Sequence, residues 1–450
     1  MSAKKLLPYL IVLLVVAGGF LISELYQSRQ AAQDKAAKKI FAVSAENIKA
    51  ITFKRDHQEV ELAKDKNWQI VKPIKTPGAD FTINSLAETL AGLEKQRELE
   101  VESGKLAEYG LDHPCLTVEF TIEAKAYQVR IGDKVPGGRG YYAQSDPTGK
   151  VLLISAVDKE ALDKDLMALR DKKIFSFSAD QVKELQIQTG KLNVDLERTG
   201  SQTWTLKGQP KTRIRSDKVA SLIRQLSSLQ AQEFVSEKPE NLKKYGLAPK
   251  PAARLTVSYD KQQETLLLGA EKDKLCYAHK SGTSPITLVN LELLTGLPTS
   301  WAQLEDRRLW SGTESDVEKL TWGTPNQQYQ VIREKDALRL TLPDGRVEKK
   351  PIIRLSSLLW RLKELEYQRL VPADRFNLKD PDVILQLYGA EDKLRLKLEA
   401  GKAQPADQLP VRATQGDQTL NALVSARSFA NWRQELDNLL AAPSPESSSQ

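Results

Sequence analysis

The sequence predicts an α+β protein built from three tandem copies of a module of about 135 residues, in which helices pack on antiparallel strands, behind one N-terminal transmembrane helix. Two observations predict the repeat. A turn-like motif returns along the chain at a near-constant interval, and three other landmarks return in the same register. Repeats of a fixed period are copies of one structural unit, so they determine the architecture before any single element does.

The repeated turn consists of an aromatic residue, a residue that tolerates positive φ, leucine and, shortly afterwards, proline. It occurs as Tyr109-Gly110-Leu111 before Pro114, as Tyr245-Gly246-Leu247 before Pro249, and in weaker form as Phe376-Asn377-Leu378 before Pro381. The aromatic residues are 245 − 109 = 136 and 376 − 245 = 131 positions apart. This pattern is typical of a tight turn that ends a helical segment and begins a strand. We expect positive φ at both glycines.

Three further landmarks keep the interval. Trp68 followed by Pro73 returns as Trp204 followed by Pro210, with 204 − 68 = 136. Tyr142-Ala143 returns as Tyr277-Ala278, with 277 − 142 = 135. An apolar triplet occurs as Ile48-x-x-Ile51-x-Phe53, Val182-x-x-Leu185-x-Ile187 and Val317-x-x-Leu320-x-Trp322. Repeats are usually kept for packing, so we expect these residues to have structural roles.

An apolar run at the N-terminus predicts a membrane anchor. Leu6–Ile22 contains no charged residue, and extension to Tyr26 brings the run close to the roughly 20 residues that a spanning helix needs. A cleaved signal peptide is the alternative, but Ala17-Gly18-Gly19 is a poor cleavage site. We predict an uncleaved single-pass anchor with the N-terminus inside and the body outside the cytoplasm.

The remaining boundaries follow from the repeats and from composition. The residues after the anchor are rich in Ala, Gln and Lys, which favours a helical stalk, and the end is rich in Pro and Ser, which favours disorder. We predict an anchor over 1–26, a stalk over 27–43, modules over 44–176, 177–312 and 313–440, and a disordered tail over 441–450. Residues 178–312 are expected to fold on their own.

Each module is expected to contain three short strands, a helix, the repeated turn and further strands. In module one, hydrophobic alternation predicts strands at 48–54, 58–63, 67–71, 116–122, 127–131, 141–143 and 151–154. Helical spacing predicts helices from Asp80, as N-cap, to about Leu99 and from 158 to 169.

The other two modules are expected to repeat this order. Module two has predicted strands at 182–188, 192–197, 203–206, 253–259, 263–268 and 286–289, and a helix whose apolar positions are Val219, Leu222, Ile223, Leu226 and Leu229. Module three has predicted strands at 317–322, 328–333, 337–342, 383–388 and 393–398, a helix with a leucine stripe from Leu355 to Leu365, and a last helix over 426–440.

The sequence contains no recognisable catalytic or metal-binding motif. The three histidines, His57, His113 and His279, have no partner at metal-ligand spacing. Val135–Gly140 is rich in glycine but lacks the Gly-Lys-Ser/Thr ending of a phosphate-binding loop. Cys115 and Cys276 occupy different module positions and are expected as two buried thiols. We expect a non-enzymatic protein without cofactor or metal.

One basic cluster lies between a predicted strand and the helix of module two. Residues 178–312 contain 20 basic and 15 acidic residues, which supplies +5 of the net charge of +7. The cluster is a candidate contact for anionic lipid headgroups or an acidic partner, with a solvated helix face as the alternative. Without interleaved aromatic residues, it does not indicate nucleic acid. Its residues are Lys207, Lys211, Arg213, Arg215, Lys218 and Arg224.

These motifs resemble those of domain-of-unknown-function family 4340 over roughly residues 45–310. The resemblance rests on the anchor, Trp68 with Pro73, the helix with Ala79, Asp80, Ile83, Leu86 and Leu90, the Tyr109 turn, Ile131-Gly132 and Tyr142-Ala143. Module three departs from the pattern with Leu338 in place of Trp, Phe376-Asn377 in place of Tyr-Gly, and Leu398-Glu399 in place of Ile-Gly.

The resemblance implies a bacterial, membrane-anchored protein associated with a gliding-type ABC transport system. It implies no catalytic residues. We therefore expect an accessory or scaffold protein in the bacterial inner membrane that docks on an ABC transporter permease or auxiliary subunit, with its body in the periplasm or outside the cell. The alternatives are a module that binds an envelope polymer or a lipid and, less favoured, an enzyme.

Overall fold

The computed structural model describes residues 37–55, 58–101, 105–146, 150–190, 192–238, 241–324 and 327–441. The predicted anchor over 1–26 lies outside these residues, as do stalk residues 27–36 and tail residues 442–450. Within the described part of the chain, no helix has both the length and the apolar character to cross a membrane.

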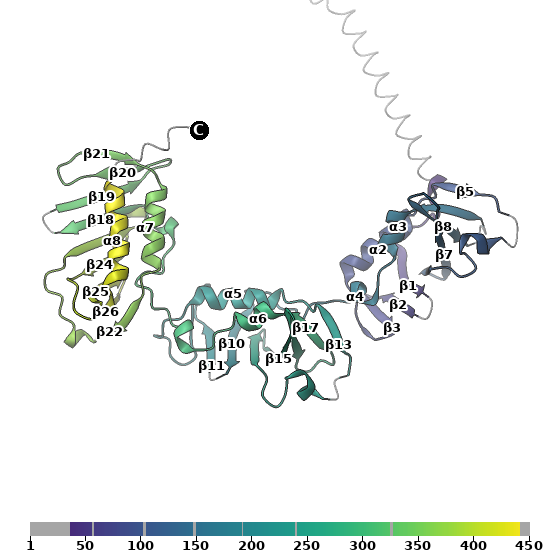
Figure 1. Ribbon diagram of the computed structural model, residues 1–450, viewed down its shortest axis with the longest axis horizontal. Coiled ribbons are helices and arrows are strands. Elements are labelled where there is room, and N and C mark those ends of the chain that lie inside the picture. Colours follow the sequence, from purple (N-terminus) through teal and green to yellow (C-terminus); the bar gives the residue numbers. More distant parts are fainter. Residues whose placement is uncertain are drawn as a thin grey trace, which may run out of the picture. The chain divides into compact units, whose positions relative to one another are not determined.

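The described chain forms three antiparallel sheets with helices, and the prediction of antiparallel strands with packed helices in repeated units is confirmed (Figure 1). Strands outweigh helices. By spatial proximity, the chain divides into two compact units, as far as they are described. Of the described residues, the first unit takes those within 37–195 and 220–297, and the second takes those within 196–219 and 298–441. The predicted module boundaries at 176/177 and 312/313 stay predictions.

The first sheet lies within the first unit and has the strand order β4-β3-β2-β1-β6-β7-β8-β9-β5. Its strands are β1 (Ile48–Arg55), β2 (Gln58–Lys64), β3 (Trp68–Lys72), β4 (Thr76–Pro77), β5 (Arg97–Leu99), β6 (Leu116–Ile122), β7 (Lys125–Lys134), β8 (Gly140–Ser145) and β9 (Val151–Ser155). Its helices are α2 (Asp80–Gly92), α3 (Ala156–Leu162) and α4 (Leu166–Leu169).

The second sheet has the order β12-β11-β10-β14-β15-β16-β17-β13. Its strands are β10 (Val182–Thr189), β11 (Leu192–Arg198), β12 (Trp204–Leu206), β13 (Glu233–Ser236), β14 (Ala253–Tyr259), β15 (Gln262–Lys272), β16 (Leu275–Lys280) and β17 (Ile286–Asn290). Its helices are α5 (Ser216–Ser227) and α6 (Leu291–Thr295). Strand β12 and the first residues of α5 belong to the second compact unit.

The third sheet has the order β21-β20-β19-β18-β23-β24-β25-β26-β22. Its strands are β18 (Lys319–Thr324), β19 (Gln327–Arg333), β20 (Leu338–Thr341), β21 (Val347–Lys350), β22 (Tyr367–Leu370), β23 (Val383–Tyr388), β24 (Leu394–Ala400), β25 (Gln408–Gln415) and β26 (Gln418–Ser425). Helices α7 (Ile353–Lys363) and α8 (Ala426–Leu440) lie side by side on it (Figure 1).

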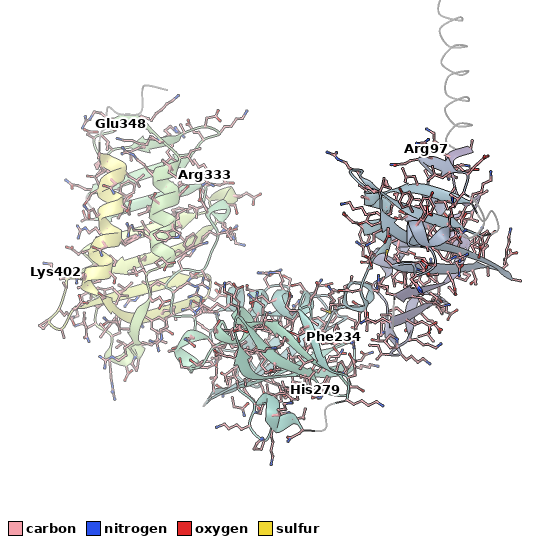
Figure 2. The ribbon with its side chains drawn as sticks, turned by 45° about the vertical axis from the view of Figure 1, so that its right-hand side comes forward. Arg97, Phe234, His279, Arg333, Glu348 and Lys402 are labelled. Atoms are coloured by element: carbon pink, nitrogen blue, oxygen red, sulfur yellow. The ribbon has the colours of Figure 1, made fainter. Side chains whose placement is uncertain are left out.

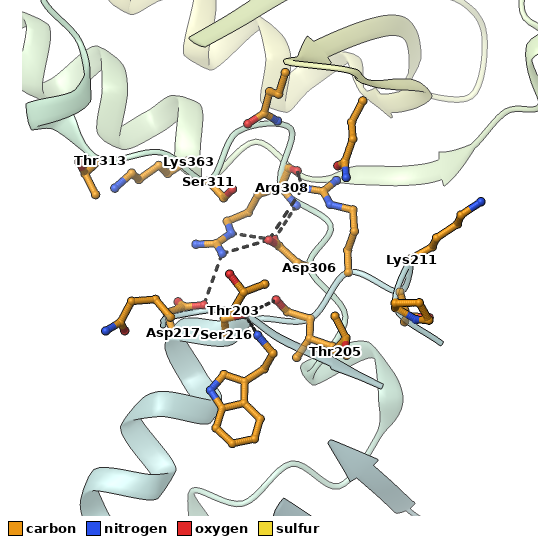
Figure 3. Close-up of a pocket in the computed structure, with 18 residues that line it drawn as sticks. Thr203, Thr205, Lys211, Ser216, Asp217, Asp306, Arg308, Ser311, Thr313 and Lys363 are labelled. Carbon is orange, nitrogen blue, oxygen red and sulfur yellow. Dashed lines mark hydrogen bonds and ion pairs between the residues drawn. The ribbon is translucent and has the colours of Figure 1, made fainter. Parts of the chain in front are cut away.

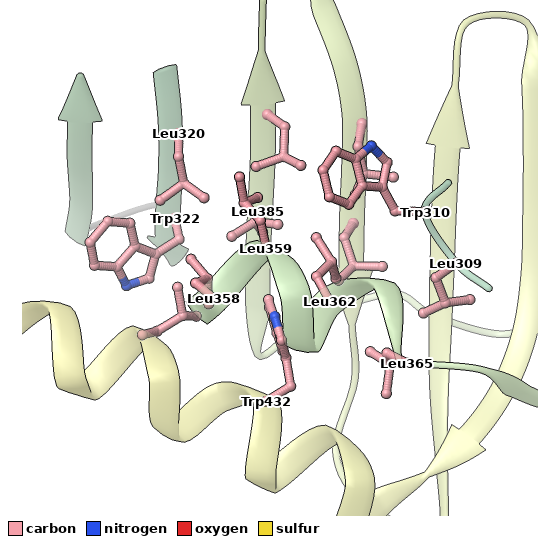
Figure 4. Packing of buried hydrophobic residues seen from close by; sticks show 14 of the residues in the cluster. Leu309, Trp310, Leu320, Trp322, Leu358, Leu359, Leu362, Leu365, Leu385 and Trp432 are labelled. Carbon is pink, nitrogen blue, oxygen red and sulfur yellow. The ribbon is translucent and has the colours of Figure 1, made fainter. Parts of the chain in front are cut away.

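A buried core joins α7 and α8 to the third sheet. Leu358 and Leu362 on α7, Trp432 on α8 and Leu385 on β23 are each at most 1 % exposed (Figure 4). Helical spacing places the two leucines on one face of α7, and strand alternation places Leu385 on the facing side of the sheet. The leucine stripe of the sequence therefore marks this core correctly.

The structure corrects two predicted helices in the first unit. The helix that begins near Asp80 ends at Gly92, because Leu93 is extended with φ −61° and ψ 121°, and Arg97–Leu99 then pairs with β9. The predicted helix over 158–169 is two helices. Asp165 is extended, with φ −77° and ψ 171°, and its side chain caps α4 by accepting a hydrogen bond from the Ala168 amide.

The strands missed by the sequence analysis include one that recurs in every sheet. These strands are β5, β13 and β22, which follow α2, α5 and α7 in the chain. They pair with β9, β17 and β26, respectively. They have three or four residues and mixed polarity, so alternation does not mark them. β16, β21, β25 and β26 were also missed. Each sheet is thus completed by a strand from its own stretch of chain.

One cysteine prediction is wrong. Cys276 is buried, but Cys115 is exposed. Cys115 stands directly before β6, where its Sγ donates a hydrogen bond to the Gly132 carbonyl oxygen at 3.3 Å. Both cysteines are free thiols.

Candidate functional site

The repeated turn brings several landmarks of the sequence together. Gly110 has φ +66° and Gly246 has φ +68°, which confirms the predicted left-handed conformation. The ring of Tyr109 lies 4.8 Å from that of Tyr142, and the rings of Tyr245 and Tyr277 lie 5.0 Å apart. Two landmarks that are separate in the sequence therefore form one contact in each of the first two sheets.

The other motif residues divide into buried anchors and exposed turns. Trp68, Trp204, Leu111 and Leu247 are each 1 % exposed, whereas Pro73 and Pro210 are exposed. Leu378, Pro114 and Pro381 are half-buried. Phe376 is half-buried. Asn377 stands where the first two turns have glycine and does not have positive φ, so the third turn does not repeat the left-handed conformation.

The tryptophans also fix the start of the following helix. The Trp68 amide donates to the Asp80 carboxylate at 2.7 Å, and the Trp204 amide donates to Ser216 Oγ at 2.9 Å. Asp80 is the first residue of α2, and the N-cap is Ala79, so the predicted N-cap is displaced by one residue. Because these bonds join the start of a strand to the start of the following helix, we assign both tryptophans to packing and chain direction.

A second repeated motif was missed in the sequence. Two basic residues, an aliphatic residue and an aromatic residue occur as Lys38-Lys39-Ile40-Phe41, Lys172-Lys173-Ile174-Phe175 and Arg307-Arg308-Leu309-Trp310, with 172 − 38 = 134 and 307 − 172 = 135. Each aliphatic amide donates to the end of a main helix, with N–O distances of 2.8 Å from Ile40 to Leu93, 3.0 Å from Ile174 to Leu229 and 3.1 Å from Leu309 to Leu365. The constant interval was the signal that could have revealed it.

A cavity of about 660 Å³ lies beside the last of these segments (Figure 3). All 18 residues that line it belong to the second compact unit. They come from β12 and the residues on either side of it, the start of α5, the segment 306–313, the end of α7, the last residue of β25 and the first of β26. Hydroxyl and amide side chains dominate the lining, so the cavity is polar.

A buried ion pair holds one wall of the cavity. Asp306 is 6 % exposed and accepts hydrogen bonds from Arg308 Nε at 2.7 Å and Nη2 at 3.2 Å. Arg308 Nη2 also lies 3.4 Å from Asp217 Oδ1 at the start of α5. The remaining nitrogen, Nη1, points away from both carboxylates (Figure 3). Arg308 therefore has one donor group left for a further contact.

The charges of this wall shift two pKa values. Burial alone would raise the pKa of Asp217, but the hydrogen bond from Arg215 and the charge of Arg308 outweigh it and lower that pKa. Burial alone would lower the pKa of Arg308, but the hydrogen bond and charge of Asp306 outweigh it and raise that pKa. Both groups therefore stay charged at neutral pH.

Two buried polar atoms on cavity-lining residues have no hydrogen-bond partner among the described residues. They are Nη1 of Arg213 and Oγ1 of Thr205, and Thr205 as a whole is 6 % exposed. Arg213 uses its Nη2 to donate to the Arg308 carbonyl oxygen at 2.8 Å. A buried polar group without a partner costs about 1–3 kcal/mol, so both atoms favour a bound polar group nearby.

The structure separates the members of the predicted basic cluster. Lys211 and Arg213 line the cavity, whereas Lys207, Arg215, Lys218 and Arg224 do not. Arg215 pairs with Asp217 at 3.2 Å and Glu366 at 3.5 Å, and Lys218 donates to the Gln303 carbonyl oxygen at 3.2 Å. Sequence reasoning missed Arg308 and Lys363, which are distant in the chain and complete the basic lining.

The described residues contain no group of three or more His, Cys, Asp or Glu that could hold a metal ion. His57 lies outside the described residues, His113 is exposed, and His279 Nδ1 lies 3.2 Å from the Pro285 carbonyl oxygen. His279 on β16 is labelled in Figure 2.

Three antiparallel sheets with closely similar strand orders, each with a helix after its first strands, define a tandem-repeat protein. The sequence matches the family described as Domain of unknown function (DUF4340) over residues 68–235 and again over 204–381, and the chain belongs to this family. No curated protein matches.

One solved structure that is similar is DNA polymerase III subunit beta from Borrelia burgdorferi in complex with a natural product. The two sequences are 7 % identical, and the match covers 88 % of this chain and 96 % of that chain. Its TM-score of 0.15 is too low to carry an argument.

Proposed function

We propose that this chain is a non-enzymatic accessory protein of an ABC-type, gliding-like transport system. Its N-terminal segment anchors it in the bacterial inner membrane, and its repeated sheets lie in the periplasm or outside the cell. It docks on a permease or an auxiliary subunit and acts as a scaffold. The family resemblance suggests this role, and one feature of the fold supports it.

That feature is the hydrogen-bonded connection between consecutive sheets. In the first unit, one connection runs through Leu169 and Ile174. The Leu169 carbonyl oxygen accepts a hydrogen bond at 2.8 Å from the amide of Ala79, which directly precedes α2. The Ile174 amide donates at 3.0 Å to the carbonyl oxygen of Leu229, which follows α5. In the second unit, the Leu304 carbonyl accepts from Arg215 at 2.8 Å, and Leu309 donates to Leu365 at 3.1 Å. Connections paired on both sides suit a scaffold better than loose linkers do.

Co-purification tests this role. The full chain, with a C-terminal tag, is isolated from gently solubilised membranes, and the bound proteins are identified by mass spectrometry. We expect permease or ATPase subunits of one ABC transporter at near-stoichiometric amounts, absent from a tagged single-pass protein with the same anchor and no repeats. Recovery of the chain without transporter subunits, in several mild detergents, would contradict the proposal.

A second function is favoured by the cavity beside Arg308. Its lining combines cations with many hydroxyl groups, which suits an anionic or hydroxylated ligand. The second candidate is therefore a module that binds an envelope polymer or a lipid headgroup. Recovery of glycan or lipid in place of transporter subunits supports this candidate over the first.

A further inference from the structure

The cavity beside Arg308 has an equivalent one repeat earlier. A second cavity of about 330 Å³ lies in the first compact unit. Its lining residues Lys75, Asp171 and Lys173 correspond to Lys211, Asp306 and Arg308, with 211 − 75 = 136, 306 − 171 = 135 and 308 − 173 = 135. The same repeat positions therefore form a cavity twice in one chain.

The two cavities carry the same charge. The earlier cavity is lined by four basic residues, Lys75, Arg170, Lys173 and Lys280, and by two acidic residues, Asp171 and Glu237, which gives 4 − 2 = +2. The later cavity is lined by Lys211, Arg213, Arg308 and Lys363 and by Asp217 and Asp306, which also gives 4 − 2 = +2. An excess of positive charge in a confined polar cavity attracts anions.

Each cavity is also lined by an arginine that other residues hold in place and that has one buried nitrogen without a hydrogen-bond partner among the described residues. Arg170 is 4 % exposed, pairs with Glu237 and lies over the ring of Phe234, with 3.3 Å from Cζ to the ring centre. Phe234 is labelled in Figure 2. Nε of Arg170 has no hydrogen-bond partner among the described residues, and the same is true of Nη1 of Arg213.

Other basic groups remain at the cavities. Lys280 Nζ forms an ion pair with Glu264 Oε1 at 3.1 Å. Lys75 and Lys211 occupy equivalent repeat positions, and both are exposed. Beside them stand the equivalent threonines Thr76 and Thr212. Lysine and arginine donate charge-assisted hydrogen bonds to oxyanions, and threonine hydroxyls bond to hydroxylated carriers.

From these observations we propose that each cavity binds one oxyanion group, a phosphate ester or a carboxylate, carried by a hydroxylated molecule such as a sugar. The chain then has two equivalent binding sites, one in each compact unit. The inference rests on the second candidate function and is independent of the association with a transporter. Cavities of about 330 and 660 Å³ are large enough for a sugar-sized ligand.

Titration calorimetry on the purified full chain in detergent tests the proposal. The probes are glucose 6-phosphate and glucuronate, with glucose as the neutral control. We expect two sites per chain for at least one of the two acidic probes, weakened by added salt, and no binding of glucose. Lys75→Gln and Lys211→Gln should each weaken one site about tenfold, and the double variant should weaken both.

The matched control is Lys243→Gln, an exposed lysine outside both cavities. The proposal is overturned if this variant weakens binding as much as Lys211→Gln, if glucose binds equally well, or if neither acidic probe binds. It is also overturned if phosphatidylglycerol vesicles bind while both sugars do not. These results do not depend on transporter co-purification, so the two proposals fail separately.

Alginate, a polymer of uronates, identifies the source of the ligand. Binding of alginate that is more than tenfold tighter per uronate than that of glucuronate supports the oxyanion sites and assigns them to a polymer. Equal affinity per uronate supports the same sites and assigns them to a free small molecule. Either result should depend on Lys75 and Lys211.

Discussion

Gly132 on β7 lies directly beneath the turn that contains Tyr109. A β-carbon added to Gly132 would lie 2.2 Å from the carbonyl oxygen of Tyr109, a distance that a real contact does not reach. The second sheet repeats this relationship, because a β-carbon on Gly269 would lie 2.2 Å from the carbonyl oxygen of Tyr245. The turn can therefore pack this closely against the strand only because the strand has glycine at that position.

Gly132→Ala should destabilise the first sheet. The added methyl group has to displace backbone, and such overpacking costs about 1–3 kcal/mol in the free energy of unfolding. Gly92→Ala is the control, since a β-carbon at this last residue of α2 would meet no atom within 4 Å. Urea unfolding of both variants measures the effect. Equal stabilities would show that the turn can move away from β7 at no cost.

Gly110→Val and Gly246→Val should each destabilise the sheet that contains the changed residue by about 1–3 kcal/mol. The backbone is left-handed at both glycines, and a β-carbon would come within 2.6 Å of Asp133 at Gly110 and 2.7 Å of Ala270 at Gly246. Thermal melting followed by circular dichroism measures the change. Unchanged melting of both variants would remove the proposed role of the turn.

Asp163 should contribute stability that is lost in acid. It accepts a hydrogen bond from Arg55 Nε at 2.7 Å and pairs with Lys159. Burial alone would raise the pKa of Asp163, but the hydrogen bond from Lys159 and the charges of Arg55 and Lys159 outweigh it, so that pKa is lowered from 3.8. A lowered pKa means that the stabilisation is complete above the unfolded value near 3.8 and is lost as pH falls below it.

The test compares the full chain with Asp163→Asn by urea unfolding at several pH values. At pH 6 the variant should be less stable by about 1 kcal/mol, since the carboxylate is partly exposed and its pairs are screened. The difference should shrink as pH falls below 4. A difference that stays constant down to pH 2.5 would show that the carboxylate charge contributes nothing.

The sequence predicted the parts of the fold that depend on strong local patterns. Leu358 and Leu362 follow helical spacing, and the strands around Ile51 and Leu185 alternate, so burial of one face fixes these elements. The edge strands β5, β13 and β22 were missed because three or four residues of mixed polarity contain no such pattern. These strands form because they pair with β9, β17 and β26, which come later in the chain. The local sequence does not reveal such a distant partner.

The cavities were predicted only in part. Lys211 and Arg213 stand in one basic segment, so their charge was visible in the sequence. Arg308 reaches the same cavity because the backbone of the connection pairs with residues 213–215, and Lys363 reaches it from the end of α7. Such convergence of distant residues is a property of tertiary structure. Lys173 and Arg308 are separated by the repeat interval, so their equivalence could have been found in the sequence but was overlooked.

The predicted anchor can be tested by topology. A reporter that is active only outside the cytoplasm, fused after Ala441, should be active in the full chain. An apolar helix near the N-terminus that is not cleaved would leave Met1 or Ser2 as the first residue of the mature protein. N-terminal sequencing that finds a start near Phe20, or activity of a cytoplasmic reporter at the same position, would contradict the anchor.

The last prediction concerns where the second sheet can be cut from the chain. Phe175 and Phe177 are 1 % and 4 % exposed, and the ring of Phe177 lies 5.2 Å from that of Tyr259 on β14. The Lys172 carbonyl accepts a hydrogen bond from the Ala231 amide at 2.8 Å. A fragment of residues 178–312 would lose these groups, although the sequence alone predicted that it folds.

We therefore expect residues 170–312 to fold cooperatively and residues 178–312 to be molten or insoluble. Truncation of one buried Phe costs about 3–5 kcal/mol, and the loss of two approaches the whole stability of a typical domain. Phe175→Ala in the longer fragment separates the role of the ring from that of the backbone bonds. Sharp, equal melting of both fragments would show that the opening segment is dispensable. Aggregation of both would show that the second sheet needs residues beyond 312, as the grouping of β12 with the second compact unit allows.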